Sequence, residues 1–161
     1  MKGASDVVTS QTRREFCNHV FQAGGVLLLG TSLGQFLVGC KEDSAANAPQ
    51  LPTVSGSLAG GTVVVNNVSG TALAATGSAA LVQYSGGSLL VAHSAQDTFV
   101  AVTSICTHQQ CTITGFKDQL YVCPCHGSQF HTNGQVAQGP ANAPLRTFAT
   151  QFANDQLTIA L

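Results

Sequence analysis

Two short clusters of cysteine and histidine are the part of this sequence that could carry chemistry. They read Cys106-Thr107-His108-Gln109-Gln110-Cys111 and Cys123-Pro124-Cys125-His126-Gly127-Ser128. Cysteine thiolates and histidine imidazoles bind transition metals such as zinc and iron. The fourteen residues between His108 and Cys123 leave room for a strand, a turn and a second strand. The two clusters can therefore face each other across one metal site.

Two cysteines and two histidines alone are an ambiguous ligand set. The Cys2His2 combination is common in structural zinc sites, so a zinc-stabilised binding module is one interpretation. A zinc site does not need the additional pair, Cys111 and Cys125, or the Gly127-Ser128 that follows the second histidine. These extra residues favour an iron–sulfur centre over zinc. Cys111 and Cys125 could themselves be free buried thiols.

The pattern C-x-H-x2-C followed by C-x-C-H-G-S resembles the Rieske iron–sulfur domain. The resemblance is to the disulfide-bearing subclass found in cytochrome bc complexes and in the small subunits of arsenite-oxidase-like enzymes. It covers roughly residues 55–161 and is most specific over residues 104–145. It implies a [2Fe–2S] cluster with one iron held by Cys106 and Cys123 and the other held by His108 and His126. It also implies a disulfide between Cys111 and Cys125.

The resemblance assigns roles to two further positions. Ser128 corresponds to a serine that donates a hydrogen bond to a cluster sulfur. Pro140 lies in the segment 134–145, GQVAQGPANAPL, which corresponds to a proline loop that covers the cluster and limits the access of water. Gly-Pro also marks ordinary surface turns, and the position next to the second cluster favours the proline-loop interpretation.

Phe130 departs from the family pattern, which usually has a tyrosine that donates a second hydrogen bond at this position. Hydrogen bonds to the cluster sulfurs stabilise the reduced, more negative state and so raise the reduction potential. We expect the Phe130→Tyr variant to have a higher potential than the wild type. One hydrogen bond contributes about 1 kcal/mol, or roughly fivefold in the reduction equilibrium. A redox titration of both proteins measures this, and the absence of an upward shift would contradict it.

Short β-rich runs separated by glycine, serine and asparagine make up the chain beyond residue 61. These runs are residues 62–65, 80–84, 88–92, 99–105, 120–122, 145–152 and 157–161. Gly86-Gly87 and Asn154-Asp155 predict hairpin turns between neighbouring runs. Outside the amino-terminal segment no window has sustained helical periodicity. We expect residues 58–161 to form one small all-β domain. By resemblance, this is a Rieske-type antiparallel β sandwich with a cluster-binding subdomain of two loops and a proline loop.

Residues 1–40 have the features of a targeting segment. Thr12-Arg13-Arg14-Glu15-Phe16 matches the twin-arginine export signal, and residues 16–39 contain no Lys, Arg, Asp or Glu. Leu37-Val38-Gly39-Cys40 resembles a bacterial lipobox, which predicts lipidation of Cys40 after cleavage. An uncleaved membrane span is an alternative, because about 20 apolar residues cross a bilayer. Release of a soluble protein is another. Export would place the protein on the outer face of the cytoplasmic membrane or in the periplasm, where a disulfide is stable.

Residues 41–57, KEDSAANAPQLPTVSGS, have the composition of a flexible linker. A linker of this length would let a tethered domain move between an electron donor and an acceptor. It could equally be a simple spacer between the domain and the membrane.

Charge is sparse from residue 41 onward, with three positive and five negative side chains. The sequence has no basic patch, so nucleic-acid binding is not supported. No residue pattern indicates an acid, base or nucleophile for bond-making chemistry. We therefore expect a one-electron carrier, the iron–sulfur subunit of a membrane-associated quinol–cytochrome c oxidoreductase-type complex with cytochrome b- or c-type partners. An arsenite-oxidase-like molybdenum enzyme, or a role as a stand-alone periplasmic carrier, is the alternative. Gln109-Gln110, where the family usually has Leu-Gly, makes the tip more polar and leaves quinol binding open.

Overall fold

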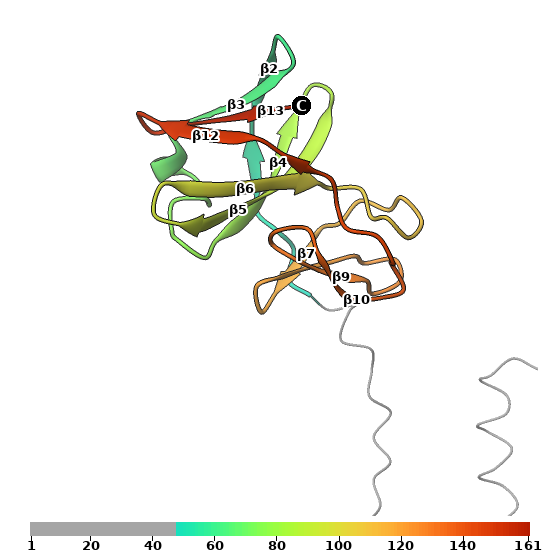
Figure 1. Ribbon diagram of the computed structural model, residues 1–161. Coiled ribbons are helices and arrows are strands. Elements are labelled where there is room, and N and C mark those ends of the chain that lie inside the picture. Colours follow the sequence, from blue (N-terminus) through green and yellow to red (C-terminus); the bar gives the residue numbers. More distant parts are fainter. Residues whose placement is uncertain (1–47) are drawn as a thin grey trace, which may run out of the picture. The chain divides into compact units, whose positions relative to one another are not determined.

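The computed structural model describes residues 48–161 (Figure 1). Apart from one short 3-10 helix, Val68–Gly70, its regular elements are strands. The first seven strands are β1 (Thr53–Ser55), β2 (Ser57–Ala59), β3 (Thr62–Asn66), β4 (Ala79–Tyr84), β5 (Gly87–Ala95), β6 (Thr98–Thr103) and β7 (Gly115–Lys117). The remaining six are β8 (Leu120–Val122), β9 (Gln129–His131), β10 (Val136–Gln138), β11 (Thr147–Phe148), β12 (Thr150–Ala153) and β13 (Gln156–Ala160). The prediction of an all-β domain is confirmed.

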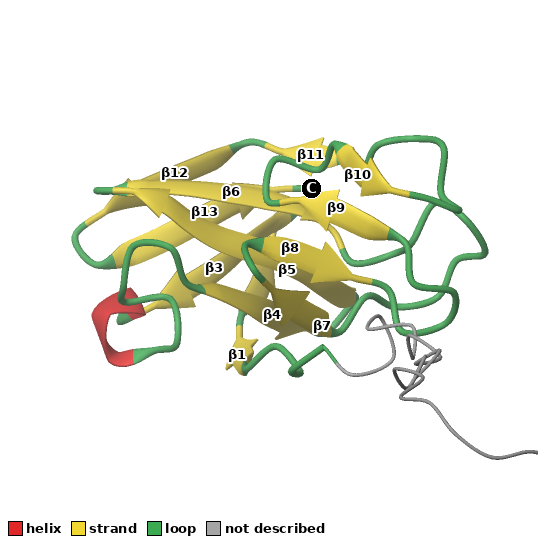
Figure 2. Cartoon of the chain, turned by 90° about the horizontal axis from the view of Figure 1, so that it is seen from below, coloured by secondary structure: helices red, strands yellow, loops and turns green. Residues whose placement is uncertain are grey.

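The strands form three sheets (Figure 2). We call β1-β4-β5-β6-β11 the central sheet, β12-β13-β3-β2 the outer sheet, and β10-β9-β8-β7 the loop-bearing sheet. Every strand pair is antiparallel except β1 with β4, which is parallel. The loop-bearing sheet is the one that positions the second Cys-His cluster, because β8 ends at Val122 and β9 begins at Gln129.

The central sheet is buried on both faces, which explains its long apolar runs. On one face Leu81, Leu90 and Val102 form a cross-strand row that belongs to the same core as the loop-bearing sheet. On the other face Val82 and Leu89 pair and pack into a second core shared with the outer sheet. The metal-ligand candidates Cys106 and Cys123 lie in the first core. The strands thus hold the two clusters on a rigid apolar base.

The folded domain includes residues that precede the expected boundary at residue 58. Leu51 and Val54 are buried, and β1 pairs with β4 from Thr53 to Ser55. The Leu51 N–H also donates a hydrogen bond to the Thr114 carbonyl at 2.7 Å. The second half of the expected linker is therefore part of the fold. The composition did not reveal this, because β1 is only three residues long and contributes one buried side chain.

The predicted strand over residues 145–152 is divided in the structure. Thr147–Phe148 pairs with β6 of the central sheet, whereas Thr150–Ala153 pairs with β13 of the outer sheet. The chain therefore crosses from one sheet to the other within a single predicted strand. The predicted hairpin over Asn154-Asp155 is confirmed, and both residues have the positive φ angles, 50° and 59°, that a two-residue turn requires.

The twin-arginine pattern, the lipobox with Cys40 and the first residues of the linker lie outside the described residues. Within residues 48–161, no helix has the length and apolar character needed to cross a bilayer.

Candidate metal centre

The two Cys-His loops share one backbone design. In the first loop the Cys106 N–H donates to the Cys111 carbonyl, and the Gln110 N–H donates back to the Cys106 carbonyl. In the second loop Cys123 N–H donates to the Ser128 carbonyl, and the Gly127 N–H donates back to the Cys123 carbonyl. Each loop is closed at its fifth residue by a positive φ angle, 57° at Gln110 and 75° at Gly127. Hydrogen bonds therefore close both loops at their base, and both loops face the same site.

Gln110 occupies the left-handed conformation that Gly127 occupies in the second loop, and a glutamine is strained there. We expect Gln110→Gly to stabilise the domain by about 0.5–1 kcal/mol, because relief of the strain of about 1–2 kcal/mol exceeds the backbone entropy that glycine loses. Thermal unfolding measures this. The matched variant Gly127→Ala should destabilise the domain, and a lower midpoint for Gln110→Gly would contradict the argument.

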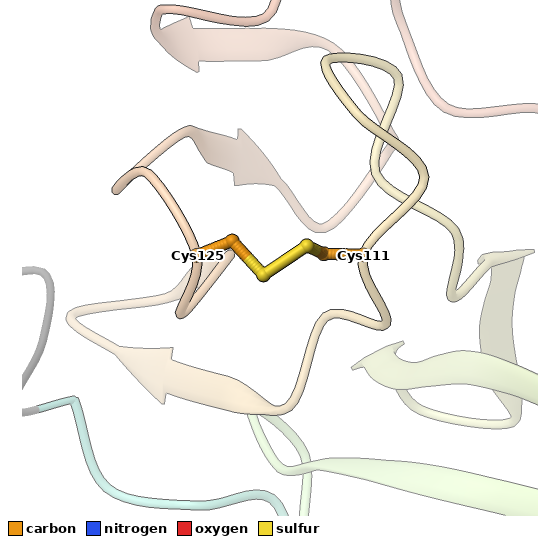
Figure 3. Close-up of a disulfide and its surroundings, with 2 residues drawn as sticks. All are labelled: Cys111 and Cys125. Atoms are coloured by element: carbon orange, nitrogen blue, oxygen red, sulfur yellow. A yellow bond between two sulfur atoms is a disulfide. The ribbon is translucent and has the colours of Figure 1, made fainter.

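A disulfide between Cys111 and Cys125 joins the two loops (Figure 3). The pairing implied by the resemblance is confirmed. The sulfurs of Cys111, Cys123 and Cys125 lie within 4.8 Å of one another. Those of Cys111 and Cys125 are bonded to each other, so they are not available as thiolate ligands. The proximity instead means that the disulfide packs directly against Cys123.

Cys106 and Cys123 remain as unpaired thiols among the described residues, and each is only 1 % exposed. The two side chains lie in the same core, one from each loop. Burial raises the pKa of the Cys123 thiol, and Cys106 raises it further. The backbone N–H groups of Cys125 and His126 oppose this shift in pKa, because they donate hydrogen bonds to the Cys123 sulfur. Two buried thiols without a counter-charge are well suited to share a positively charged metal centre.

The predicted histidine ligands are also brought together. The His108 and His126 rings lie 4.9 Å apart between centroids and meet edge to face at 88°. His126 is exposed and His108 is half-buried. The Nδ1 atom of His108 is buried and has no hydrogen-bond partner in the described part of the chain. A buried imidazole nitrogen without a partner is costly, and a metal ion would satisfy it. The four side chains therefore fit a centre with two thiolate and two imidazole ligands.

The segment around Pro140 is fastened to both loops. The Ala141 N–H donates a hydrogen bond of 3.0 Å to Ser128 Oγ, and Thr107 Oγ1 donates one of 2.6 Å to the Ala143 carbonyl. Pro140 follows a cis peptide bond and is exposed, whereas Ser128 is completely buried. Because Ser128 Oγ accepts from Ala141, its own proton remains free to donate to a neighbouring group. The proline segment therefore contacts both loops.

Tyr121 was not singled out from the sequence. Its side chain is 0 % exposed and lies in the same core as Cys106 and Cys123. Burial raises the pKa of its phenol far above the ordinary value, so the hydroxyl keeps its proton. The only signal in the sequence is that Tyr121 lies two residues before Cys123. Alternation along β8 therefore places both side chains on the same face of the sheet.

Together these features define a small all-β metalloprotein whose site combines thiol and imidazole ligands on two disulfide-joined loops. Comparison with known families shows that residues 61–149, more than half of the chain, match the Rieske [2Fe-2S] domain. The chain is 30 % identical over 162 aligned residues to the cytochrome b6-f complex iron-sulfur subunit 1 of Synechocystis sp.. That alignment covers 94 % of this chain and 85 % of the relative.

Two further comparisons cover shorter stretches. The ubiquinol-cytochrome c reductase iron-sulfur subunit of Bradyrhizobium diazoefficiens is 38 % identical over 64 residues, which are 38 % of this chain and 36 % of that relative. Among solved structures, a chain from the complex of reduced oxygenase and oxidized ferredoxin in carbazole 1,9a-dioxygenase matches with a TM-score of 0.50 and 25 % identity. It covers 60 % of this chain and 98 % of that chain. The chain therefore belongs to the Rieske [2Fe–2S] domain family. Its cofactor is a Rieske-type [2Fe–2S] cluster, and its activity is electron transfer.

Proposed function

We propose that this chain is the iron–sulfur subunit of a membrane-associated quinol–cytochrome c oxidoreductase-type complex. Two relatives with this role in their names, from a cytochrome b6-f complex and a ubiquinol-cytochrome c reductase, support the proposal. The observation that carries it is the convergence of a buried thiol pair and a histidine pair on two disulfide-joined loops. The disulfide is the feature that the resemblance associates with this subclass.

In this proposal Cys106 and Cys123 ligate one iron, and His108 and His126 ligate the other. When bound, the cluster accepts and returns one electron, at a potential that for Rieske centres is roughly −150 to +300 mV. The thiol side is buried and the imidazole side reaches the surface at His126. The chain therefore insulates one end of the site and leaves the other accessible to a redox partner.

The residues around the ligands set how easily the electron is accepted. The N–H groups of Cys125 and His126 stabilise negative charge on the Cys123 sulfur. The free proton of Ser128 is positioned to do the same for a cluster sulfur, and the Ala141 N–H holds that hydroxyl in place. Each such hydrogen bond favours the reduced state. In this proposal Pro140 and its neighbours also cover the site and limit the access of water.

The face around His126 is suited to a partner that docks without strong charge complementarity. From residue 98 to residue 145 the only charged side chains are Lys117 and Asp118. Pro124, Pro140 and Pro144 are exposed on the loops that carry or cover the site, and Ile105 is 43 % exposed beside Cys106.

Gln109 and Gln110 are exposed as well. Their polarity favours the second candidate function, an electron-transfer subunit of a molybdenum enzyme or a stand-alone carrier that does not oxidise quinol.

We further propose that the chain is exported by the twin-arginine pathway and anchored through lipidated Cys40 on the outer face of the cytoplasmic membrane. The support is the sequence of residues 12–16 and 37–40. A cluster inserted before export would need a pathway for folded proteins. Mass spectrometry of the mature amino terminus tests this proposal. A lipid-modified Cys40 is the expected terminus, and an intact residue 1 would contradict cleavage.

Co-purification of the full chain from detergent-solubilised membranes tests the proposed complex. We expect haem b and haem c to copurify, and we expect the reduced cluster signal to appear after addition of a short-chain ubiquinol. Copurification of molybdenum without haem b, together with no reduction by the quinol, would establish the second candidate function instead. The control is the same preparation from cells that lack this chain.

A further inference from the structure

The hydroxyl of Tyr121 has no hydrogen-bond partner among the described residues, although the side chain is completely buried. Leaving a buried donor without an acceptor costs about 1–3 kcal/mol. Such a group in a native core calls for an explanation, and a bound cofactor is one.

The surroundings of Tyr121 limit what that partner can be. Its core consists mainly of apolar side chains, and it also contains the sulfurs of Cys106, Cys123 and the half-buried Cys111. The buried Ser128 hydroxyl is nearby, and it already accepts a hydrogen bond from the Ala141 N–H. Cys111 is part of the disulfide. The acceptor with the strongest affinity for an O–H donor here would be a cysteine thiolate, or a sulfide of the cluster that Cys106 and Cys123 would hold.

The strand register places Tyr121 on the same face of the loop-bearing sheet as Cys123. Tyr121 pairs with Phe130 across β8 and β9, and the next pair on the same face is Cys123 with Ser128, joined by the Cys123 N–H bond to the Ser128 carbonyl. Side chains two residues apart on a strand point to the same side and are about 7 Å apart at their Cα atoms. A tyrosine ring spans that distance. The two cross-strand pairs, Tyr121 with Phe130 and Cys123 with Ser128, thus form one patch under the site.

We propose that the Tyr121 hydroxyl donates a hydrogen bond to a sulfur on the cysteine side of the cluster and raises its reduction potential. This rests on the proposed ligand roles of Cys106 and Cys123. The chain lacks a hydroxyl at Phe130, and its cross-strand partner Tyr121 supplies one to the same patch from the neighbouring strand. Tyr121 is therefore a residue that sets the potential.

Potentiometric titration of the purified full-length protein, followed by electron paramagnetic resonance, tests the proposal with Tyr121→Phe. We expect the reduction equilibrium to fall about tenfold, which for one electron is about 59 mV. The matched control is Tyr84→Phe, which removes the only other tyrosine hydroxyl. Tyr84 packs against the opposite core, so its removal should leave the potential unchanged. Ser128→Ala serves as a positive control, with a lowered potential.

A second measurement covers the case in which Tyr121→Phe does not fold. In the Tyr84→Phe background, 3-fluorotyrosine incorporated during expression labels position 121 alone. Fluorine makes the hydroxyl a stronger donor, so the potential should rise. An unchanged potential in either Tyr121→Phe or the fluorinated protein overturns the inference while leaving the proposed function intact. A wild-type protein without any cluster signal would overturn the proposed function itself.

Discussion

The His126→Ala variant is expected to be purified without its cluster, as a protein that lacks visible colour and bound iron. His126 is the exposed member of the histidine pair, with its ring 4.9 Å from that of His108. Removing one imidazole leaves an iron with a single protein ligand at the solvent-accessible end of the site, where water and chelators can reach it. We expect more than tenfold loss of bound iron, because ligand and even outer-sphere changes at metal sites cost 10–100-fold in metal affinity. Metal analysis and the visible absorption spectrum measure this.

The control for His126→Ala is His131→Ala. His131 is also exposed and lies only five residues further along, at the end of β9. It has no cysteine or histidine neighbour at ligand spacing, so its variant should retain the full iron content. Retention of the wild-type spectrum by His126→Ala, or its loss in His131→Ala, would contradict the proposed ligand set. Circular dichroism of both variants shows whether the β fold is intact.

The second large effect is expected when both disulfide cysteines are replaced, in the Cys111→Ala/Cys125→Ala variant. The bridge closes a loop of 14 residues, for which the chain-entropy estimate is about 3 kcal/mol of stability. For a domain of roughly 100 residues, each kcal/mol shifts the unfolding midpoint by about 4–8 °C. We therefore expect a midpoint lower by more than 10 °C. We also expect faster loss of the cluster, because the bridge packs against Cys123.

Treatment with a reductant separates the effect of the disulfide bond on stability from the effect of replacing the two cysteine side chains. Treatment of the wild type with a strong thiol reductant should lower its midpoint toward that of the double variant, and should leave the double variant itself unchanged. An equal midpoint for wild type and double variant would show that the bridge contributes nothing to stability. A reductant effect on the double variant would show that the reagent acts elsewhere, for example on the cluster.

Much of the fold could be predicted from local sequence patterns. The strands that were missed or misplaced are those whose limits are set by pairing with other strands. The runs at residues 80–84 and 88–92 became β4 and β5, because an apolar run bounded by turn residues is a local property. The strands β1, β7, β9 and β10 have three residues each, too few to show alternation. β1 forms by pairing with β4, which is distant in the sequence, whereas β7, β9 and β10 pair with neighbouring strands across short connections. The division of residues 145–152 between two sheets depends likewise on β6 and β13 and not on the segment itself.

The proximity of the candidate site residues was predictable where spacing carried the information. The short distance from Cys106 to His108, and from Cys123 to His126, placed each ligand pair on one loop. Resemblance supplied the disulfide, which the structure contains. The hydrogen bonds from Thr107 to Ala143 and from Ala141 to Ser128 could not be foreseen, since they join residues 36 and 13 positions apart. The unpartnered hydroxyl of Tyr121 is likewise visible only once the register of β8 and β9 is known.

The central claim is that the paired thiols and imidazoles hold a [2Fe–2S] cluster that carries one electron. Electron paramagnetic resonance of the aerobically purified full-length protein, before and after reduction with dithionite and alongside iron, sulfide and zinc analysis, tests it most directly. We expect no signal as isolated, a signal from one unpaired electron per protein after reduction, and equal amounts of iron and sulfide at two per chain. A colourless protein that carries zinc and remains silent after reduction would contradict the account.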